Sequence, residues 1–168
     1  MNTPESKVVM RPVAPGDRSQ MEVIRLAAFA PVFASFRSLL GDEIYELAQA
    51  REDAAQGALL DSLLAPDSGW DVYCAELTGR LVGFVSVKLN AETRMGEIGL
   101  NAVHPKEASH GVGTAMYEFA LARMKDAGMR VATVATGADA SHAPARRAYA
   151  KAGFAAQVPS VWLCRLIH

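Results

Sequence analysis

The stretch MGEIGLNAVHPKEASHGVGTAMYEFALARMKDAG, residues 95–128, decides the fold that we expect for this chain. Its first nine residues, 95–103, are expected to form a strand, and a loop follows them. Gly111 and Gly113 end this loop and open a helix that is expected to run from about 114 to 127. One face of that helix is apolar: Met116, Phe119, Ala120 and Met124. The stretch therefore predicts a strand, a glycine-containing loop and a helix in succession.

The glycine loop is the best candidate for a ligand site. Backbone N–H groups at the start of a helix point outward, and the helix dipole favours negative charge there. Glycine also lets phosphate oxygens approach the backbone without meeting a Cβ atom. A G-x-G pattern alone is a weak signal, and a plain loop before a core helix is the alternative interpretation.

Three phosphate or oxyanion motifs do not fit this loop. The sequence has no G-x-x-x-x-G-K-[ST] string, as a P-loop requires. The dinucleotide fingerprint G-x-G-x-x-G fails at its third glycine, where Met116 stands. HGVG has some likeness to a lipase oxyanion loop, but the chain has no G-x-S-x-G nucleophile elbow.

The rest of the chain predicts a mixed sheet with helices packed on it, which is an α/β fold in the broad sense. We expect a helix that Pro31 interrupts, a helical region after Gly41, and a short helix over 144–152. Further strands are expected at 8–13, 70–77, 81–89 and 131–136, with 70–77 and 81–89 forming a hairpin and 131–136 buried. The tail FAAQVPSVWLCRLIH, residues 154–168, is expected to add one or two final strands.

Length and composition exclude several classes of protein. The 168 residues fit one domain, and we treat 1–168 as a single unit. A net charge of −1 provides no excess positive field for a polyanion, so nucleic-acid binding is not expected. Two cysteines and the histidine spacing indicate neither a disulfide framework nor a metal site. MNTPESKVVM lacks the apolar core of a signal peptide, and LAAFAPVFASF is too short to cross a bilayer. We therefore expect a cytoplasmic protein that is not in a membrane.

Three blocks, GEIGLNAVHP (96–105), HGVGTAM (110–116) and HAPARRAYAKAGF (142–154), resemble the GNAT superfamily of acetyl-CoA-dependent N-acetyltransferases in order and spacing. The resemblance runs over nearly the whole chain. It implies a sheet of about six to seven strands, splayed between the strands at 95–103 and 131–136, with acetyl-CoA in the gap. Gly99 could permit the bulge that such a splay requires.

The resemblance also implies the residues that bind coenzyme A. Its pantetheine arm would pair with the backbone of Asn101, Ala102 and Val103, and its pyrophosphate would lie on the amides of residues 110–114. The whole expected set is Asn101, Ala102, Val103, Ala108, Ser109, His110, Gly111, Val112, Gly113, Thr114, His142 and Arg146. Ala108 and Ser109 depart from the loop signature [Q/R]-x-x-G-x-[G/A] and its common extra glycine, and His142 replaces the usual Asn. These departures concern side-chain contacts and leave backbone contacts intact.

Two residues are candidates for proton transfer. An amine acceptor must lose a proton before it attacks a thioester, and Glu97 stands where family members carry a glutamate base on this strand. By strand alternation, Glu97 is expected to share a face with Gly99, Asn101 and Val103. Tyr149 stands where the family places the general acid for the coenzyme A thiolate. The alternatives are a solvated carboxylate for Glu97 and a core ring for Tyr149.

By the same resemblance, the acceptor is expected to lie against the N-terminal helical region, roughly Phe29 to Leu64, with help from the final strands. The aromatic residues Phe29, Phe33 and Phe36 offer a surface for an apolar body or a cation, and the neighbouring carboxylates of Asp42, Glu43 and Glu46 would attract an ammonium group. A core role for the phenylalanines is the alternative. The resemblance thus implies direct transfer of an acetyl group from acetyl-CoA, without a metal, to an amine of a small molecule, or of a protein N-terminus or lysine. The alternatives are a non-catalytic acyl-CoA sensor, transfer to a hydroxyl, and transfer of a longer acyl chain. The apolar segment SVWLCRL could serve a homodimer.

Overall fold

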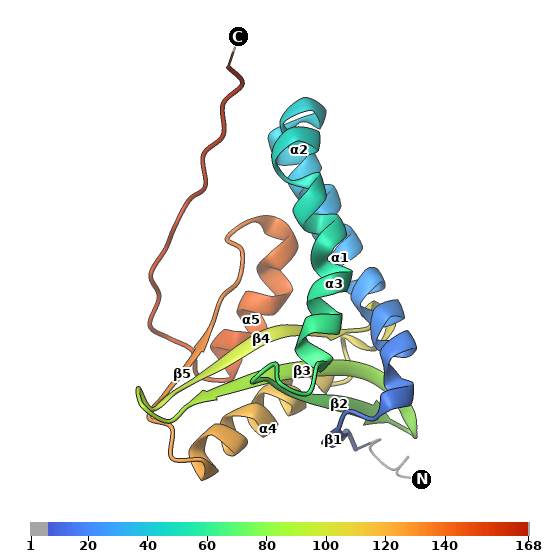
Figure 1. Ribbon diagram of the computed structural model, residues 1–168, viewed down its shortest axis with the longest axis vertical. Helices are drawn as coiled ribbons and strands as arrows, with labels where there is room; N and C mark the ends of the chain where they lie inside the picture. Colours follow the sequence, from blue (N-terminus) through green and yellow to red (C-terminus); the bar gives the residue numbers. More distant parts are fainter. Residues whose placement is uncertain (1–6, 168) are drawn as a thin grey trace.

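In the part of the chain that the structure describes, a central sheet has five strands in the order β1-β2-β3-β4-β5 (Figure 1). The structure is a computed structural model that describes residues 7–167; residues 1–6, which include part of the segment examined for a signal peptide, lie outside it. The strands are β1 (Val9–Pro12), β2 (Asp71–Leu77), β3 (Arg80–Asn90), β4 (Met95–Val103) and β5 (Val131–Val134). The helices are α1 (Arg18–Leu40), α2 (Asp42–Ala48), α3 (Ala50–Leu64), α4 (Val112–Asp126) and α5 (Ala143–Lys151). Residues 7–167 also form three short 3-10 helices, η1 (Pro15–Asp17), η2 (Pro105–Glu107) and η3 (Ala140–His142).

The sheet is mixed, which confirms the predicted α/β class. Strands β1 to β4 pair antiparallel with their neighbours, and β5 pairs parallel with β4. The predicted hairpin is β2–β3, and its two loop residues, Thr78 and Gly79, both have positive φ (53° and 75°). This backbone twist is the one that tight hairpin turns favour.

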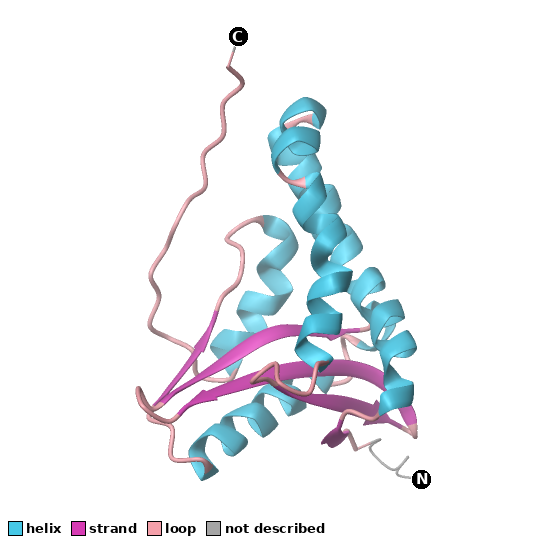
Figure 2. Ribbon diagram, viewed as in Figure 1, coloured by secondary structure: helices cyan, strands magenta, loops and turns pink. Residues whose placement is uncertain are grey.

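The strand count of six to seven was wrong for the residues described. Within 7–167 the sheet has five strands, and residues 155–167 form no strand, turn or bend (Figure 2). A strand needs a neighbouring backbone to bond with, and apolar patterning alone does not provide one. Strand β5 is also not the buried strand that was predicted. It pairs with β4 alone and lies at the edge of the sheet, where Val131 is 53% exposed.

Helices cover both faces of the sheet, with α1 and α3 on one side and α4 on the other (Figure 1). The core is accordingly divided in two. One cluster packs α4 and α5 against the sheet around Ile98 and Met116, and the other packs α1 and α3 around Ile24 and Phe84. Each face of the sheet is therefore stabilised by its own apolar layer.

Pro31 does not interrupt the first helix, contrary to prediction. Its ring lies on the exposed side of α1, while Ile24 before it and Val32 after it are both buried. Apolar contacts on either side offset the roughly 3 kcal/mol cost of an internal proline. The segment Pro15–Leu40 is consequently long and apolar enough to cross a membrane, which corrects the length assigned to this apolar stretch. A helix that packs on a sheet can have the same composition, so this finding alone does not assign the chain to a membrane.

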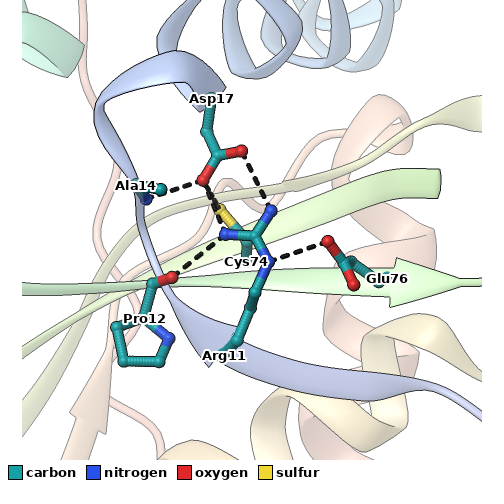
Figure 3. Close-up of polar contacts among 6 residues, drawn as sticks. All are labelled: Arg11, Pro12, Ala14, Asp17, Cys74 and Glu76. Atoms are coloured by element: carbon teal, nitrogen blue, oxygen red, sulfur yellow. Dashed lines mark hydrogen bonds and ion pairs between the residues drawn. The ribbon is translucent and has the colours of Figure 1, made fainter. Parts of the chain in front are cut away.

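An ion-pair cluster fixes the entry into α1 (Figure 3). The Arg11 guanidinium on β1 donates to both carboxylate oxygens of Asp17, at 2.6 and 2.9 Å, and to Glu76 on β2 at 2.7 Å. The Asp17 carboxylate also accepts from the Ala14 amide at 2.7 Å. The Arg11 hydrogen bonds lower the pKa of Asp17 from 3.8 to about 2. Burial and the adjacent Asp17 raise the pKa of the Cys74 thiol to about 12, so this thiol stays neutral.

We expect Asp17→Asn to reduce the free energy of unfolding by about 2 kcal/mol at pH 7, because one of the two carboxylates paired with Arg11 loses its charge. The pKa of Asp17 is lowered on folding, so its contribution is complete above the unfolded value of 3.8 and disappears as the pH falls through about 2. Urea denaturation at several pH values measures the difference. The exposed Asp67→Asn is the control, and an equal effect of the two variants at pH 7 would contradict the role of the cluster.

Candidate active site

The sheet opens between β4 and β5, as the family resemblance implied. These strands pair only over Met95–Ile98 and Val131–Val134. Beyond this point their ribbons diverge (Figure 1). The cause is a β-bulge in β4, where two residues, Gly99 and Leu100, lie opposite the single residue Ser86 of β3. A Cβ atom on Gly99 would lie 2.7 Å from the Ser86 hydroxyl and 2.5 Å from the Trp70 ring, so only glycine fits there.

The bulge reverses the faces on which the β4 side chains lie. Ile98 packs in the cluster of α4 and α5, whereas Leu100 and Ala102 pack with the cluster of α1 and α3. Glu97 therefore lies on the α1/α3 face, and Asn101 lies on the α4/α5 face, where it meets two tyrosines. The predicted shared face of Glu97 and Asn101 was wrong, because simple alternation does not continue through a bulge.

Glu97 is exposed and lies one residue before the last paired position of β4 with β5. Lys88 of β3 is its direct cross-strand neighbour, and the Lys88 ammonium is 5.7 Å from the centre of the Trp70 ring. Neighbours directly opposite in an antiparallel pair are close enough to interact. A carboxylate and a cation thus lie together where the gap between β4 and β5 begins.

Tyr149 combines the two roles that were considered for it. Its ring is in the core, 6% exposed, and its hydroxyl accepts from the Asn101 side-chain amide at 3.1 Å. Tyr117 of α4, which the sequence analysis did not identify, donates its hydroxyl to the Asn101 carbonyl at 2.9 Å, and its ring centre is 4.7 Å from that of Tyr149. Burial raises the pKa of Tyr117, so its hydroxyl stays a donor. The hydrogen bonds of Asn101 therefore connect β4 to both α4 and α5.

The glycine loop ends in an uncapped helix N-terminus. Gly111 is the N-cap of α4 and has φ of +72°, and no side chain caps the first amides of the helix. The amide of His110 already donates to the Glu107 carbonyl, so the amides left for a ligand are those of 111–114 rather than 110–114. A Cβ atom on Gly113 would lie 4.0 Å from the Val103 side chain, which places this helix start at the end of β4. Ala108, Ser109 and His110 are exposed in the loop.

The turn between β5 and α5 engages the two basic residues predicted to bind the cofactor. Arg146 donates to the backbone carbonyls of Gly137 and Asp139, at 2.6 and 2.7 Å. His142 is 17% exposed, and its Nδ1 atom is 2.5 Å from the Asp139 carboxylate, which also accepts from Ser35 of α1 at 2.8 Å. Burial raises the pKa of Asp139, but the hydrogen bonds from Ser141, Ser35 and His142 outweigh it and hold that pKa well below its usual value. Asp139, which gave no sequence signal, thus fixes this turn to α1.

Helix α1 presents a half-buried aromatic row to this region. The rings of Phe29 and Phe33 are 6.0 Å apart, and the Phe36 ring stacks on His142 at 5.9 Å. Phe29 also packs against the core cluster of α1 and α3, whereas Phe33 and Phe36 belong to neither core cluster of the described residues. The row therefore runs from the core to the start of α5.

The acidic residues beside this row are largely paired. The Arg37 guanidinium donates to Asp42 at 2.8 Å and to Glu46, and it lies 4.3 Å from the centre of the Tyr45 ring. Two of the three carboxylates that were expected to attract an ammonium group are thus already paired with Arg37. The surface that α1 presents here is therefore distinguished by its aromatic rings rather than by negative charge.

A family model for the acetyltransferase (GNAT) family matches residues 33–154, which is most of the chain. The chain belongs to the GNAT acetyltransferase family. No curated protein sequence matches the chain significantly. The part of this GNAT chain that the structure describes, 7–167, contains no group of three or more His, Cys, Asp or Glu side chains that could hold a metal ion.

Solved structures with the same fold cover nearly the whole of this GNAT chain. PaiA N-acetyltransferase from Thermoplasma acidophilum, in complex with coenzyme A, has a TM-score of 0.67 at 18% identity, with 92% of this chain and 93% of that one covered. A GNAT family acetyltransferase from Brucella melitensis, in complex with acetyl-CoA, has a TM-score of 0.63 at 21% identity, with 90% and 84% covered. An aminoglycoside acetyltransferase from an uncultured soil metagenomic sample, in complex with sisomicin, has a TM-score of 0.56 at 14% identity, with 96% and 97% covered. At these identities the likeness shows the shared fold.

Proposed function

We propose that this protein transfers an acetyl group from acetyl-CoA to the amine of a small molecule by direct attack. The observation that carries the proposal is the gap between β4 and β5, with the uncapped start of α4 at the end of β4 and the Tyr149 hydroxyl on Asn101 beside it. The complexes of two structural neighbours with coenzyme A and acetyl-CoA support this choice of co-substrate.

The binding of coenzyme A would use mainly backbone groups. Beyond Ile98 the edge of β4 that faces β5 is unpaired among the described residues, so the backbone of Asn101 to Val103 could pair with the pantetheine arm. The free amides of 111–114 and the dipole of α4 favour the pyrophosphate. Arg146 would act indirectly, by holding the turn before α5.

The reaction requires two proton transfers. The amine nitrogen attacks the thioester carbonyl after losing a proton, the C–S bond breaks, and the coenzyme A thiolate takes up a proton. We assign Glu97 as the base that accepts the proton of the amine, directly or through water. We assign the Tyr149 hydroxyl as the acid that gives a proton to the thiolate. The two groups lie on opposite faces of the sheet, and the gap between β4 and β5 is where a thioester could meet both.

The acceptor would lie against the aromatic row of α1. Phe33 and Phe36 are half-buried and adjoin His142 at the start of α5, so an apolar body or a cation could lie on their rings. The pairing of Asp42 and Glu46 with Arg37 makes these rings the principal recognition surface. The sisomicin complex of one structural neighbour supports a small amine as the acceptor class. A cytoplasmic location remains a prediction.

The test of the function is release of free thiol from acetyl-CoA in the presence of a panel of small amines. Release that depends on the amine is the expected result. Binding of acetyl-CoA without thiol release would identify a sensor, and release only with hydroxyl acceptors or longer acyl chains would identify a different transferase.

We expect Gly111→Val to abolish the rise in melting temperature that coenzyme A produces, because a side chain at this N-cap blocks the phosphate. Gly128→Val is a matched control, since Gly128 follows the other end of α4 with φ of +78° and similarly open space for a side chain. Both variants are strained alike, so only the position distinguishes them. A normal coenzyme A shift in a folded Gly111→Val protein would refute the loop assignment.

We expect Tyr149→Phe to lower kcat by roughly 10²-fold with little change in KM, as for the loss of a proton donor. The control is Tyr117→Phe, which removes the other hydroxyl on Asn101 and should have a much smaller effect.

In the same assay, Glu97→Gln should depress the rate most on the acidic side of the pH optimum, where a base is needed most. Wild-type turnover in both Tyr149→Phe and Glu97→Gln would show that neither residue transfers a proton.

Phe33→Ala or Phe36→Ala should raise KM for the acceptor at least several-fold and leave coenzyme A affinity intact, because these rings lie on α1 rather than at the glycine loop. Val23→Ala, an exposed apolar position on the same helix, is the control. Loss of folding would support a core role, and an unchanged KM in folded variants would exclude these rings from the acceptor site.

A further inference from the structure

Lys88 brings a primary amine to the point where the gap between β4 and β5 begins. It lies on β3 directly opposite Glu97 of β4, and Glu97 in turn pairs with Thr133 of β5. Strand β3 alternates regularly here. Val87 and Leu89 pack with the cluster of α4 and α5, so the side chain between them lies on the other face. The amine and the proposed base therefore share one face of the sheet.

The Trp70 ring places the Lys88 side chain next to the bulge of β4. The Lys88 ammonium is 5.7 Å from the centre of that ring. The same ring lies against the backbone of Gly99, where an added Cβ atom would be 2.5 Å from it. A cation over an aromatic face is attracted by the ring quadrupole. The amine thus lies beside the residues at which β4 turns away from β5.

The Lys88 ammonium is not engaged by a carboxylate. The residue is exposed, and none of the ion pairs among residues 7–167 includes it. By contrast, Arg37 and Arg146 are held by oxygen atoms of their own chain. A lysine side chain is a flexible four-carbon stem, so its ammonium can move from the ring toward the gap.

We propose that the protein acetylates its own Lys88 when acetyl-CoA is bound and no acceptor is present. The inference rests on the acetyl transfer proposed above, but not on the identity of the small-molecule acceptor. It adds a modification site on the chain itself, at a residue that the sequence analysis did not identify.

The reaction uses the groups already assigned to proton transfer. The Lys88 ammonium gives one proton to Glu97, its nitrogen attacks the thioester carbonyl, and the C–S bond breaks. The departing thiolate takes a proton from Tyr149, and the second proton that the nitrogen loses restores the tyrosine. Glu97 then releases its proton to water. The products are an amide on Lys88 and free coenzyme A.

Acetylation changes the site that performs it. The amide is neutral, so the cation opposite Glu97 and its attraction to the Trp70 ring are lost. An acceptor bound in the gap keeps Lys88 away from the thioester. The supply of acceptor therefore decides between transfer to a substrate and modification of the chain.

Peptide mapping after incubation with acetyl-CoA alone tests the proposal. Arg80 and Arg94 flank Lys88 in the sequence. Trypsin does not cut after an acetylated lysine, so modification leaves the peptide 81–94 intact. Lys88 should be acetylated roughly tenfold or more faster than the exposed Lys125 of α4, because Lys88 is positioned at the thioester. Equal rates at the two lysines would show ordinary chemical reactivity and overturn the proposal.

Two variants and a dilution series show that the transfer occurs within one chain. Lys88→Arg keeps a cation beside Trp70 and should abolish the fast gain of one acetyl group in the intact mass, whereas Lys125→Arg is the control and should retain it. The fraction of Lys88 modified per minute should not change when the protein is diluted. A rate that falls with protein concentration would show transfer between molecules and overturn the proposal.

Thiol release separates this inference from the proposed function. Without an added amine, the wild type should release close to one equivalent of thiol and then stop, since each chain has one Lys88. Amine-dependent release from a protein whose Lys88 stays unmodified in acetyl-CoA alone would overturn this inference and leave the proposed function standing. Acetylated Lys88 without release to any small amine would support this inference and contradict the proposed acceptor class.

Discussion

The bulge at Gly99 and Leu100 is the constraint on which the rest of the structure depends. Two residues of β4 opposite Ser86 bend the strand away from β5 after only four paired positions. The same extra residue turns Asn101 toward α4 and α5 while Glu97 stays on the face of α1 and α3. The gap between β4 and β5, and the placement on opposite faces of Glu97 and Tyr149, the two groups proposed to transfer protons, thus follow from one local irregularity, which the absence of a side chain at Gly99 allows.

Polar side chains hold the elements around this opening in place. Asn101 joins β4 to Tyr117 and Tyr149, and Asp139 joins the turn before α5 to Ser35 on α1. Each link connects elements that would otherwise be free to separate where β4 and β5 no longer bond. Satisfied polar groups of this kind stabilise one arrangement, because leaving any one of them buried without a partner is costly.

Much of the fold was predictable from local patterns. The range of β4, the β2–β3 hairpin and the start of α4 near Gly111 follow from alternation, helical spacing and turn residues. Pro31 shows the limit of such rules, since contacts of Ile24 and Val32 keep α1 continuous across it. Residues 155–167 show the converse: their apolar pattern is that of a strand, but no backbone among the described residues 7–167 pairs with them.

The sequence by itself determined the family, the glycine loop and the position of Tyr149, because each depends on residues close together in the chain. Only the tertiary structure decided which of the candidate groups are free. Arg146 is engaged by carbonyls of its own turn, His142 by Asp139, and Asp42 and Glu46 by Arg37. A charge or hydrogen-bonding group binds whichever partner the fold brings within reach, and the bulge in β4 decides which side chains meet. The partner of each charged group and the side chains that the bulge brings together cannot be read from residue spacing, because they depend on contacts between distant segments.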